Sequence, residues 1–259
     1  MDKSDTNMAL IPSILIVAGT DPTGGAGVVR DIETATHFQI KANLAITCVN
    51  VQDDNQVVEI VPMDGKLIAA QMRSALEANP ISAIKIGMTG TQAIIEAICN
   101  VLEDYPHVPV ILDPVLVASS GGKLTTEAII ETMINKLLPH VDLLTPNREE
   151  LALLSQSPLA SYHKQTIQQA KKLLSFGPHS ILIKGGHANG PLAIDSLVNK
   201  TEIMNISTPR VKGTMRGTGC ILSSAIAAHL ALNESLIEAV KKAKIYTHTL
   251  LLNHCQKEL

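Results

Sequence analysis

Residues 13–27, SILIVAGTDPTGGAG, decide the fold class of this chain. The stretch opens with an apolar run, SILIVAG, that has the length and composition of a buried strand. A glycine-rich turn follows at once, and a helical pattern begins behind it. A strand that passes through such a turn into a helix is the first half of a βαβ unit, so the stretch predicts an α/β protein with a mainly parallel sheet.

The same alternation continues along the chain. Further strands are predicted at 43–51, 83–87, 108–113, 141–145 and 180–184. Helical patterns lie between them, for example at 91–103 and 165–176. Beyond residue 184 the pattern predicts an antiparallel hairpin from 193–199 and 205–211, then a long apolar helix at 217–232 and a last helix at 235–255. Because no linker of Pro, Gly or Ser interrupts this order, we expect residues 1–259 to form one domain.

Composition excludes several classes of function. The 259 residues are 46% hydrophobic and 17% charged, which is too apolar for a disordered chain. A net charge of -3 with no Trp argues against nucleic acid as a partner. The four cysteines form no C-x-x-C pair, as expected for free thiols in a reducing compartment. Without a signal-peptide pattern or a membrane-length apolar run, we expect a cytoplasmic protein with no membrane partner.

Polar and glycine residues follow the predicted strands at one common position, directly after each strand. The carboxyl ends of parallel strands meet at one edge of the sheet, and ligands of open α/β sheets bind there. Any one such loop would be unremarkable, since these residue types populate turns. Five of them predict a ligand site at this edge: TDPTGGAG, MTG, the PV after Asp113, PNREE and GGH.

The first loop, Gly19–Gly27, fits neither the dinucleotide spacing G-x-G-x-x-G nor the P-loop. Its backbone N–H groups could approach a ligand, or the loop could be a purely structural turn. Asp21 is its ionised residue, able to accept hydrogen bonds from a hydroxyl or amino group of a ligand. As a turn or cap residue it would serve equally well.

A second element, GTGC at Gly217–Cys220, opens the long apolar helix. Small residues with free N–H groups at a positive helix end can form an anion hole for a transferred phosphoryl group. The glycines would also suit tight helix packing. We expect the helix dipole to lower the pKa of the Cys220 thiol and make it a base or nucleophile; the alternative is a small buried hydrophobic residue.

The loops after the later strands carry the remaining charged candidates. Asn147 and Glu150 are three apart, so they share a helix side and offer hard oxygen ligands to Mg2+, although Glu150 could simply be a first-turn acid. Asp113 could share the metal. Lys184 is placed to meet nucleotide phosphates, unless it is merely solvated. A glycine-rich loop, a metal carboxylate, a lysine and an anion hole together meet the needs of phosphoryl transfer.

The motifs AGTDPTGGAG, KIGM, ILDPV, LLTPN, KGGH and RGTGC, in this order, resemble the hydroxymethylpyrimidine/phosphomethylpyrimidine kinase family, which is related to pyridoxal kinase. The resemblance runs from about residue 13 to about residue 249. It implies a ribokinase-like, three-layer α/β/α fold with a mainly parallel central sheet, and a homodimer. It also implies a kinase of thiamine biosynthesis that uses ATP and Mg2+ to phosphorylate 4-amino-5-hydroxymethyl-2-methylpyrimidine and then its monophosphate.

Matching motifs carry the family's roles onto this chain. The pyrimidine site would comprise Asp21, Gln52 and Met88, and a Gln amide can pair with an aminopyrimidine edge. The nucleotide would face Lys184, Gly185, Gly186 and Asn147, and the magnesium Glu150 and Asp113. The catalytic group would comprise Lys184 with the anion hole of Gly217, Thr218, Gly219 and Cys220, where Cys220 stands at the position of a catalytic Asp in sugar kinases.

The chain departs from the family pattern at two places near the candidate site, and it also lacks the family's usual C-terminal pattern of Gly-Pro and paired His. Met215 and Arg216 precede GTGC where the family usually has Thr-His, and Asp53 and Asp54 replace its Asn-Thr. Two alternatives therefore stay open beside the pyrimidine kinase. One is a degenerate relative that binds a pyrimidine or vitamer without phosphorylating it. The other is a pyridoxal or sugar kinase of the same fold.

Overall fold

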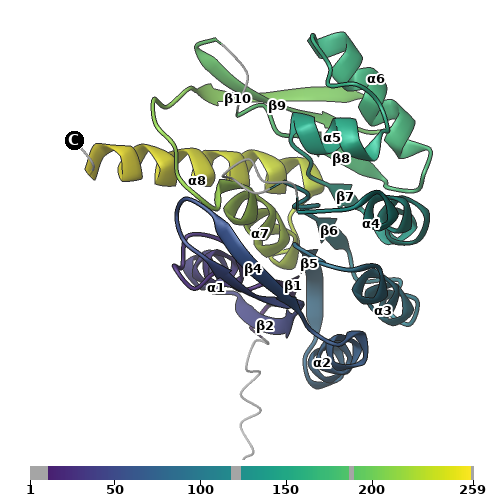
Figure 1. The fold of residues 1–259 in the computed structure, drawn as a ribbon. Coiled ribbons are helices and arrows are strands. Elements are labelled where there is room, and N and C mark those ends of the chain that lie inside the picture. Colours follow the sequence, from purple (N-terminus) through teal and green to yellow (C-terminus); the bar gives the residue numbers. More distant parts are fainter. Residues whose placement is uncertain (1–10, 118–123, 187–189, 258–259) are drawn as a thin grey trace, which may run out of the picture.

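The computed structural model describes residues 11–117, 124–186 and 190–257, and its central feature is an eight-stranded sheet with helices on both faces (Figure 1). The strand order is β10-β9-β8-β7-β6-β5-β1-β2. The strands are β1 (Ser13–Ala18), β2 (Lys41–Ile46), β5 (Ile81–Ile86), β6 (Val110–Leu112), β7 (Leu143–Leu144), β8 (Ser180–Ile183), β9 (Leu192–Val198) and β10 (Ile203–Pro209).

In this sheet the strands β8, β7, β6, β5, β1 and β2 all pair in parallel with their neighbours in that series. Strand β9 runs antiparallel to both β8 and β10. The predicted late hairpin is thus confirmed as β9 and β10. Parallel strands need crossover connections, and these place helices over both faces of the sheet. The expected mainly parallel α/β architecture is confirmed.

The helices divide into two layers around the sheet (Figure 1). One layer contains α1 (Gly27–His37), α7 (Thr218–Ala231) and α8 (Leu236–Lys257). The other contains α2 (Gly65–Ala78), α3 (Gln92–Leu102), α4 (Glu127–Thr132), a π-helical and a 3-10 turn at Met133–Leu137 and Leu138–His140, α5 (Arg148–Leu154) and α6 (His163–Leu174).

Strand β1 shows why both faces of the sheet must be covered. Successive side chains of a strand point to opposite faces. Ile14 and Ile16 pack in the core beneath α1 and α7, whereas Leu15 and Val17 pack in the core beneath α2 and α3. Burying each of these side chains contributes about 1.5–3 kcal/mol to folding. An unbroken apolar run is therefore the expected signature of this strand.

The prediction of a single strand at 43–51 is wrong, because the chain leaves the main sheet at Thr47. Strand β2 ends before Thr47, and β3 (Cys48–Gln52) pairs antiparallel with β4 (Val57–Pro62) in a separate hairpin. Thr47 donates its backbone N–H to Ala18 O at 3.1 Å and its hydroxyl to Met88 O at 2.6 Å. We call residues Cys48–Pro62 the flap hairpin.

The flap hairpin lies outside the two helix layers and reaches toward the loop that precedes α7 (Figure 1). Within the described part of the chain, no helix is long and apolar enough to cross a membrane.

Candidate active site

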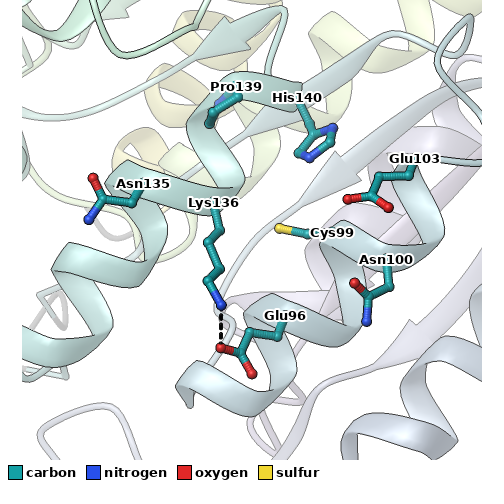
Figure 2. A pocket seen from close by; sticks show the side chains of 8 residues that line it. All are labelled: Glu96, Cys99, Asn100, Glu103, Asn135, Lys136, Pro139 and His140. Carbon is teal, nitrogen blue, oxygen red and sulfur yellow. Dashed lines mark hydrogen bonds and ion pairs between the residues drawn. The ribbon is translucent and has the colours of Figure 1, made fainter.

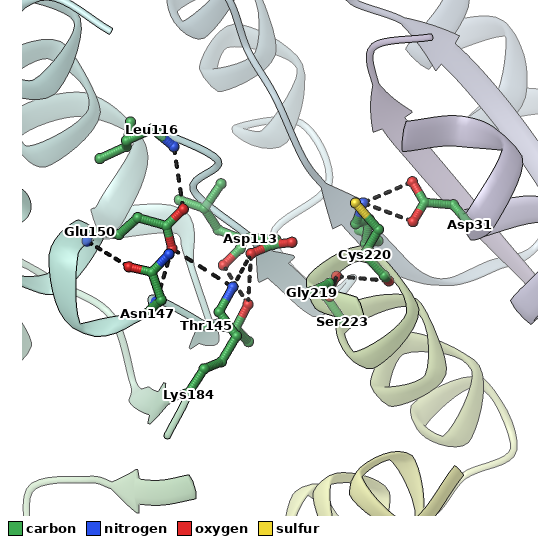
Figure 3. Close-up of polar contacts among 12 residues, drawn as sticks. Asp31, Asp113, Leu116, Thr145, Asn147, Glu150, Lys184, Gly219, Cys220 and Ser223 are labelled. Atoms are coloured by element: carbon green, nitrogen blue, oxygen red, sulfur yellow. Dashed lines mark hydrogen bonds and ion pairs between the residues drawn. The ribbon is translucent and has the colours of Figure 1, made fainter. Parts of the chain in front are cut away.

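The polar residues that follow β6, β7 and β8 meet at one edge of the sheet, beside the start of α7 (Figure 3). Lys184 Nζ lies 2.7 Å from Asp113 Oδ1 and 3.7 Å from Glu150 Oε2. The hydroxyl of Thr145 is 3.5 Å from the same Asp113 oxygen. Three groups predicted from separate loops therefore form one charged cluster. We call Lys184 and Asp113 the open pair, and Glu150 is its neighbour.

Lys184 stays charged in this cluster. Burial disfavours its ammonium group, but the carboxylates of Asp113 and Glu150 outweigh this and hold the pKa of Lys184 above its ordinary value. The Lys184 side chain retains 17% exposure, against 3% for Asp113. A permanently positive group thus remains accessible at the edge where a ligand would arrive.

Glu150 and Asn147 form a reciprocal cap at the start of α5. The Asn147 side-chain oxygen accepts from the Glu150 N–H at 2.9 Å, and Glu150 Oε2 accepts from the Asn147 N–H at 2.8 Å. Burial raises the pKa of Glu150, while Lys184 works in the opposite direction. The first-turn role left open for Glu150 is therefore present in the structure, and it aims this carboxylate at Lys184.

The start of α7 lies directly against the open pair. Gly217 adopts the left-handed conformation at φ 74°, and a Cβ there would fall 2.5 Å from Gly25 O. A Cβ on Gly219 would stand 3.3 Å from both Asp113 Oδ2 and Lys184 Nζ. Gly217 caps α7 without a side-chain hydrogen bond to the first N–H groups. These N–H groups suit an anion placed next to Lys184, as the anion-hole prediction requires.

The expectation that the helix end lowers the pKa of Cys220 is wrong. Burial raises the pKa of this thiol to about 11; Lys85 opposes the rise, whereas the carboxylates of Asp31 and Asp113 add to it. Desolvation and two nearby negative charges thus outweigh the helix dipole. In the ligand-free protein Cys220 is a neutral thiol.

Sequence reasoning missed the charged pair beneath Cys220. Lys85 Nζ donates to both carboxylate oxygens of Asp31 at 2.9 and 2.8 Å, and Ser224 donates to Asp31 Oδ1 at 2.7 Å. Both side chains of this sealed pair, Lys85 and Asp31, are fully buried. The available signal was a lysine inside the apolar strand AIKIG, since a buried strand position tolerates a charge only when it is paired.

The predicted pyrimidine residues also come together. Burial acts to raise the pKa of Asp21, but hydrogen bonds from Gln52 and Thr23 and the charge of Arg216 hold it below its ordinary value. Asp21 Oδ1 accepts from the Thr23 N–H at 3.0 Å and from its hydroxyl at 2.9 Å. The flap hairpin therefore brings Gln52 onto the glycine-rich loop.

Asn50 is a further residue that sequence reasoning missed. Its side-chain N–H donates to Thr20 O at 2.9 Å and lies 3.9 Å from the sulfur of Met88. Its Oδ1 atom is buried and has no hydrogen-bond partner among residues 11–117, 124–186 and 190–257. An unsatisfied buried amide oxygen is costly and suits a ligand N–H donor. Asn50 and Gln52 alternate in VNVQ and so share a strand face, which was the available signal.

The two glycines after β8 differ. The N–H of Gly185 donates to Asp195 Oδ1 at 2.8 Å, and a Cβ on this residue would lie 1.7 Å from Ile194 O. Gly185 thus packs tightly against β9. Gly186 is exposed, and no atom of the residues that the structure describes lies within 4 Å of an added Cβ. Of the two, Gly186 is better placed for the predicted nucleotide contact.

The donor set suits magnesium held chiefly through a nucleotide. In residues 11–117, 124–186 and 190–257, no three His, Cys, Asp or Glu side chains gather into a metal cluster. Mg2+ commonly takes only one or two carboxylates and completes its shell with phosphate and water. Asp113 and Glu150 both approach Lys184 and supply those hard oxygens.

A hollow of about 570 Å³ lies elsewhere, between α3 and the turns that follow α4 (Figure 2). Lys136 and Glu96 form an ion pair of 2.7 Å within it. Both side chains are about half exposed, so the pair is of the solvated kind that contributes little. None of the predicted site residues lines this hollow.

Comparison with known proteins agrees with the geometry. The hydroxymethylpyrimidine/phosphomethylpyrimidine kinase of Aquifex aeolicus is 36% identical over 231 residues, 89% of this chain and 90% of that protein. The phosphomethylpyrimidine kinase of Clostridium difficile 630 superposes with a TM-score of 0.80 at 31% identity, over 93% of this chain and 99% of that one.

A pyridoxal kinase from Staphylococcus aureus, solved with AMP-PCP and pyridoxal, gives a TM-score of 0.85 at 26% identity, covering 94% of this chain and 88% of its own. These likenesses confirm the ribokinase-like fold and the kinase class. Residues 21–258 match the model of one family, described as phosphomethylpyrimidine kinase. This chain belongs to the phosphomethylpyrimidine kinase family.

Proposed function

We propose that this protein transfers the γ-phosphoryl group of ATP to a hydroxymethylpyrimidine and then to its monophosphate, in thiamine biosynthesis. The observation that carries the proposal is the start of α7, which has no side-chain hydrogen bond from its cap residue and lies against Lys184 and Asp113. Phosphoryl transfer depends mainly on positioning and on neutralising the charge of the transferred group. A helix N-terminus beside a permanently charged lysine provides both.

In the first reaction the substrate hydroxyl attacks the γ-phosphorus while the bond from that phosphorus to the β–γ bridging oxygen breaks. The N–H groups of Gly217 to Cys220 stabilise the charge on the transferred oxygens, and Lys184 stabilises charge on the nucleotide phosphates. Asp113 and Glu150 would hold magnesium, which neutralises phosphate charge when bound.

In the reaction of the hydroxymethylpyrimidine, which we call the alcohol, Cys220 would take the proton of the attacking hydroxyl as a thiolate, whose own proton has first passed to solvent. In the second reaction the attacking oxygen belongs to a phosphate that is already ionised at neutral pH, so no proton needs to be removed. The two reactions therefore differ in their need for a base. Because Cys220 is a neutral thiol in the free protein, the free-energy cost of ionising this thiol should fall on the alcohol reaction alone.

The pyrimidine would bind between the glycine-rich loop and the flap hairpin. The unpartnered Asn50 oxygen can accept from the amino group of the ring, and the Gln52 amide can pair with a ring nitrogen. Asp21 holds Gln52 in place, and Met88 lies beside Asn50. The pyridoxal kinase alternative is weaker, because identity to the pyrimidine kinase of Aquifex aeolicus is 36% against 26% to the pyridoxal kinase.

The same proposal extends to the setting of the enzyme. The whole chain, residues 1–259, would act as one kinase domain, as a homodimer in the cytoplasm, without nucleic-acid or membrane partners.

The test is ADP release measured with MgATP and four acceptors side by side: the hydroxymethylpyrimidine, its monophosphate, pyridoxal and ribose. We expect turnover with the first two and at most weak turnover with the others. Faster turnover of pyridoxal or ribose would identify that compound as the substrate in place of the pyrimidine. Tight pyrimidine binding without any ADP release would establish a degenerate binding protein.

A further inference from the structure

The two departures of this chain from the family pattern touch each other in the structure. Arg216, which precedes the anion hole, reaches Asp54 in the turn of the flap hairpin, 162 residues away in sequence. Arg216 Nη1 lies 2.6 Å from Asp54 Oδ1, and Arg216 Nη2 lies 3.0 Å from Asp21 Oδ2. One guanidinium thus joins the flap hairpin, the glycine-rich loop and the start of α7.

The two carboxylate partners of Arg216 are unequal. The Asp21 side chain is 1% exposed and is also bonded to Thr23 and Gln52, so it is a fixed part of the loop. The Asp54 side chain is 76% exposed. An exposed ion pair contributes little stability, so Asp54 is the partner that an incoming anion can replace.

The backbone near Arg216 is built to hold the guanidinium in place. A Cβ on Gly25 would lie 3.0 Å from Arg216 Nη1, and Nη1 also donates to the Thr23 hydroxyl at 3.0 Å. Gly217, the next residue, packs against Gly25 O. The guanidinium is therefore fixed between the residues proposed to bind the pyrimidine and the N–H groups proposed to bind phosphoryl oxygens.

Charge decides which substrate benefits from this position. The alcohol is neutral, whereas its monophosphate carries two negative charges between the pyrimidine residues and the start of α7. A planar guanidinium forms paired hydrogen bonds with phosphate, and such charge-assisted bonds are about twice as strong as neutral ones. Asp54, being negative, competes with that phosphate for Arg216.

We propose that Arg216 is a specificity-determining residue that binds the phosphate of the monophosphate substrate in exchange for Asp54, and so favours the monophosphate over the alcohol. This rests on the proposed function for its two substrates. The flap hairpin is held by Asp54 while the alcohol is bound and is released from Arg216 when the monophosphate binds.

The test measures KM and calorimetric Kd for both substrates in wild type, Arg216→Gln, Arg216→Lys and Asp54→Asn. Arg216→Gln should weaken binding of the monophosphate by about 10- to 100-fold, the size expected for hydrogen bonds to a charged group. It should weaken binding of the alcohol by no more than about fivefold. Arg216→Lys should fall between, because lysine keeps the charge but loses the paired geometry.

Asp54→Asn should act in the opposite direction and tighten binding of the monophosphate by up to about fivefold, because it removes the carboxylate that competes for Arg216. The matched control is Glu59→Gln, which removes one exposed acid from the same hairpin and should leave both substrates unchanged. A purely structural tie would instead make Arg216→Gln and Asp54→Asn weaken both substrates alike. That result, or equal losses for the two substrates in Arg216→Gln, overturns the proposal.

Failure of the proposed function would look different. If wild type binds both pyrimidines and releases no ADP, the kinase assignment fails, while the calorimetric ratio between the two substrates still decides the role of Arg216.

Discussion

Two lysine–aspartate pairs stand on either side of the start of α7, and they differ mainly in their access to water. The sealed pair, Lys85 and Asp31, has fully buried side chains, and Lys85 contacts both oxygens of Asp31. The open pair, Lys184 and Asp113, keeps its lysine 17% exposed and has Glu150 nearby. The same two residue types thus occupy a closed and an accessible site.

The difference teaches that burial decides what a charged pair can do. A sealed pair can neutralise itself and position its neighbours, and breaking it leaves an uncompensated charge in the core. An open pair can exchange partners with phosphate and metal. We therefore expect the sealed pair to govern stability and the open pair to govern turnover.

The largest expected effect is on the sealed pair. Lys85→Met should lower the free energy of unfolding by about 3–5 kcal/mol, because it strands the carboxylate of Asp31 in the core. Chemical denaturation measures this. The double variant Lys85→Met, Asp31→Leu should recover most of the loss, since an apolar pair of similar volume packs without charge. A stability loss below 1 kcal/mol, roughly the cost of an exposed pair, would show that water reaches the Asp31 carboxylate.

For the open pair, Lys184→Met should lower kcat by about 10^2- to 10^3-fold, the cost of losing one charge-stabilising group in the transition state. Its loss of stability should be smaller than that of Lys85→Met, because water can solvate Asp113 once the lysine is gone. Steady-state kinetics and denaturation on the same preparations give both values. The contrast between the two pairs would be wrong if both variants lost the same free energy of unfolding and the same fraction of kcat.

Between the two pairs, Cys220→Ala should slow the alcohol reaction by about 10^2-fold, the lower end of general-base effects, and the monophosphate reaction much less. Because the free thiol has a pKa of about 11, wild-type kcat/KM for the alcohol should keep rising with pH between 7.5 and 10, and the rise should vanish in Cys220→Ala. Equal slowing of both reactions would assign Cys220 to the anion hole alone.

The smallest effect concerns the neighbour of the open pair. Glu150→Gln should raise the magnesium concentration for half-maximal rate by a few fold, because the amide replaces a charged ligand and keeps the first-turn geometry of α5. Titration of activity with magnesium at fixed ATP measures this. An unchanged requirement would leave Glu150 as a helix cap only.

Much of the fold was predictable because most of the buried parallel strands are apolar runs that end in a polar loop. The loops also located Asp113, Glu150 and Lys184 at one edge, since parallel strands end together. The break at Thr47 was not predictable from local pattern: both sides of it favour extended chain, and no Gly or Pro marks it.

The remaining features depend on contacts between distant residues. The pKa of Cys220 is set by burial and by Asp31 and Asp113, whose positions the sequence alone does not give. The pairing of Arg216 with Asp54 joins two departures that looked independent in sequence. The orphaned oxygen of Asn50 likewise depends on how the flap hairpin folds onto the glycine-rich loop.

The central claim is that the site transfers phosphate to a pyrimidine twice, and phosphorus NMR of the wild-type reaction tests it most directly. With the hydroxymethylpyrimidine and excess MgATP, the account predicts a monophosphate signal that forms first and then gives way to a diphosphate, while ATP converts to ADP in step. Binding of the pyrimidine with neither signal, at saturating MgATP, would contradict it.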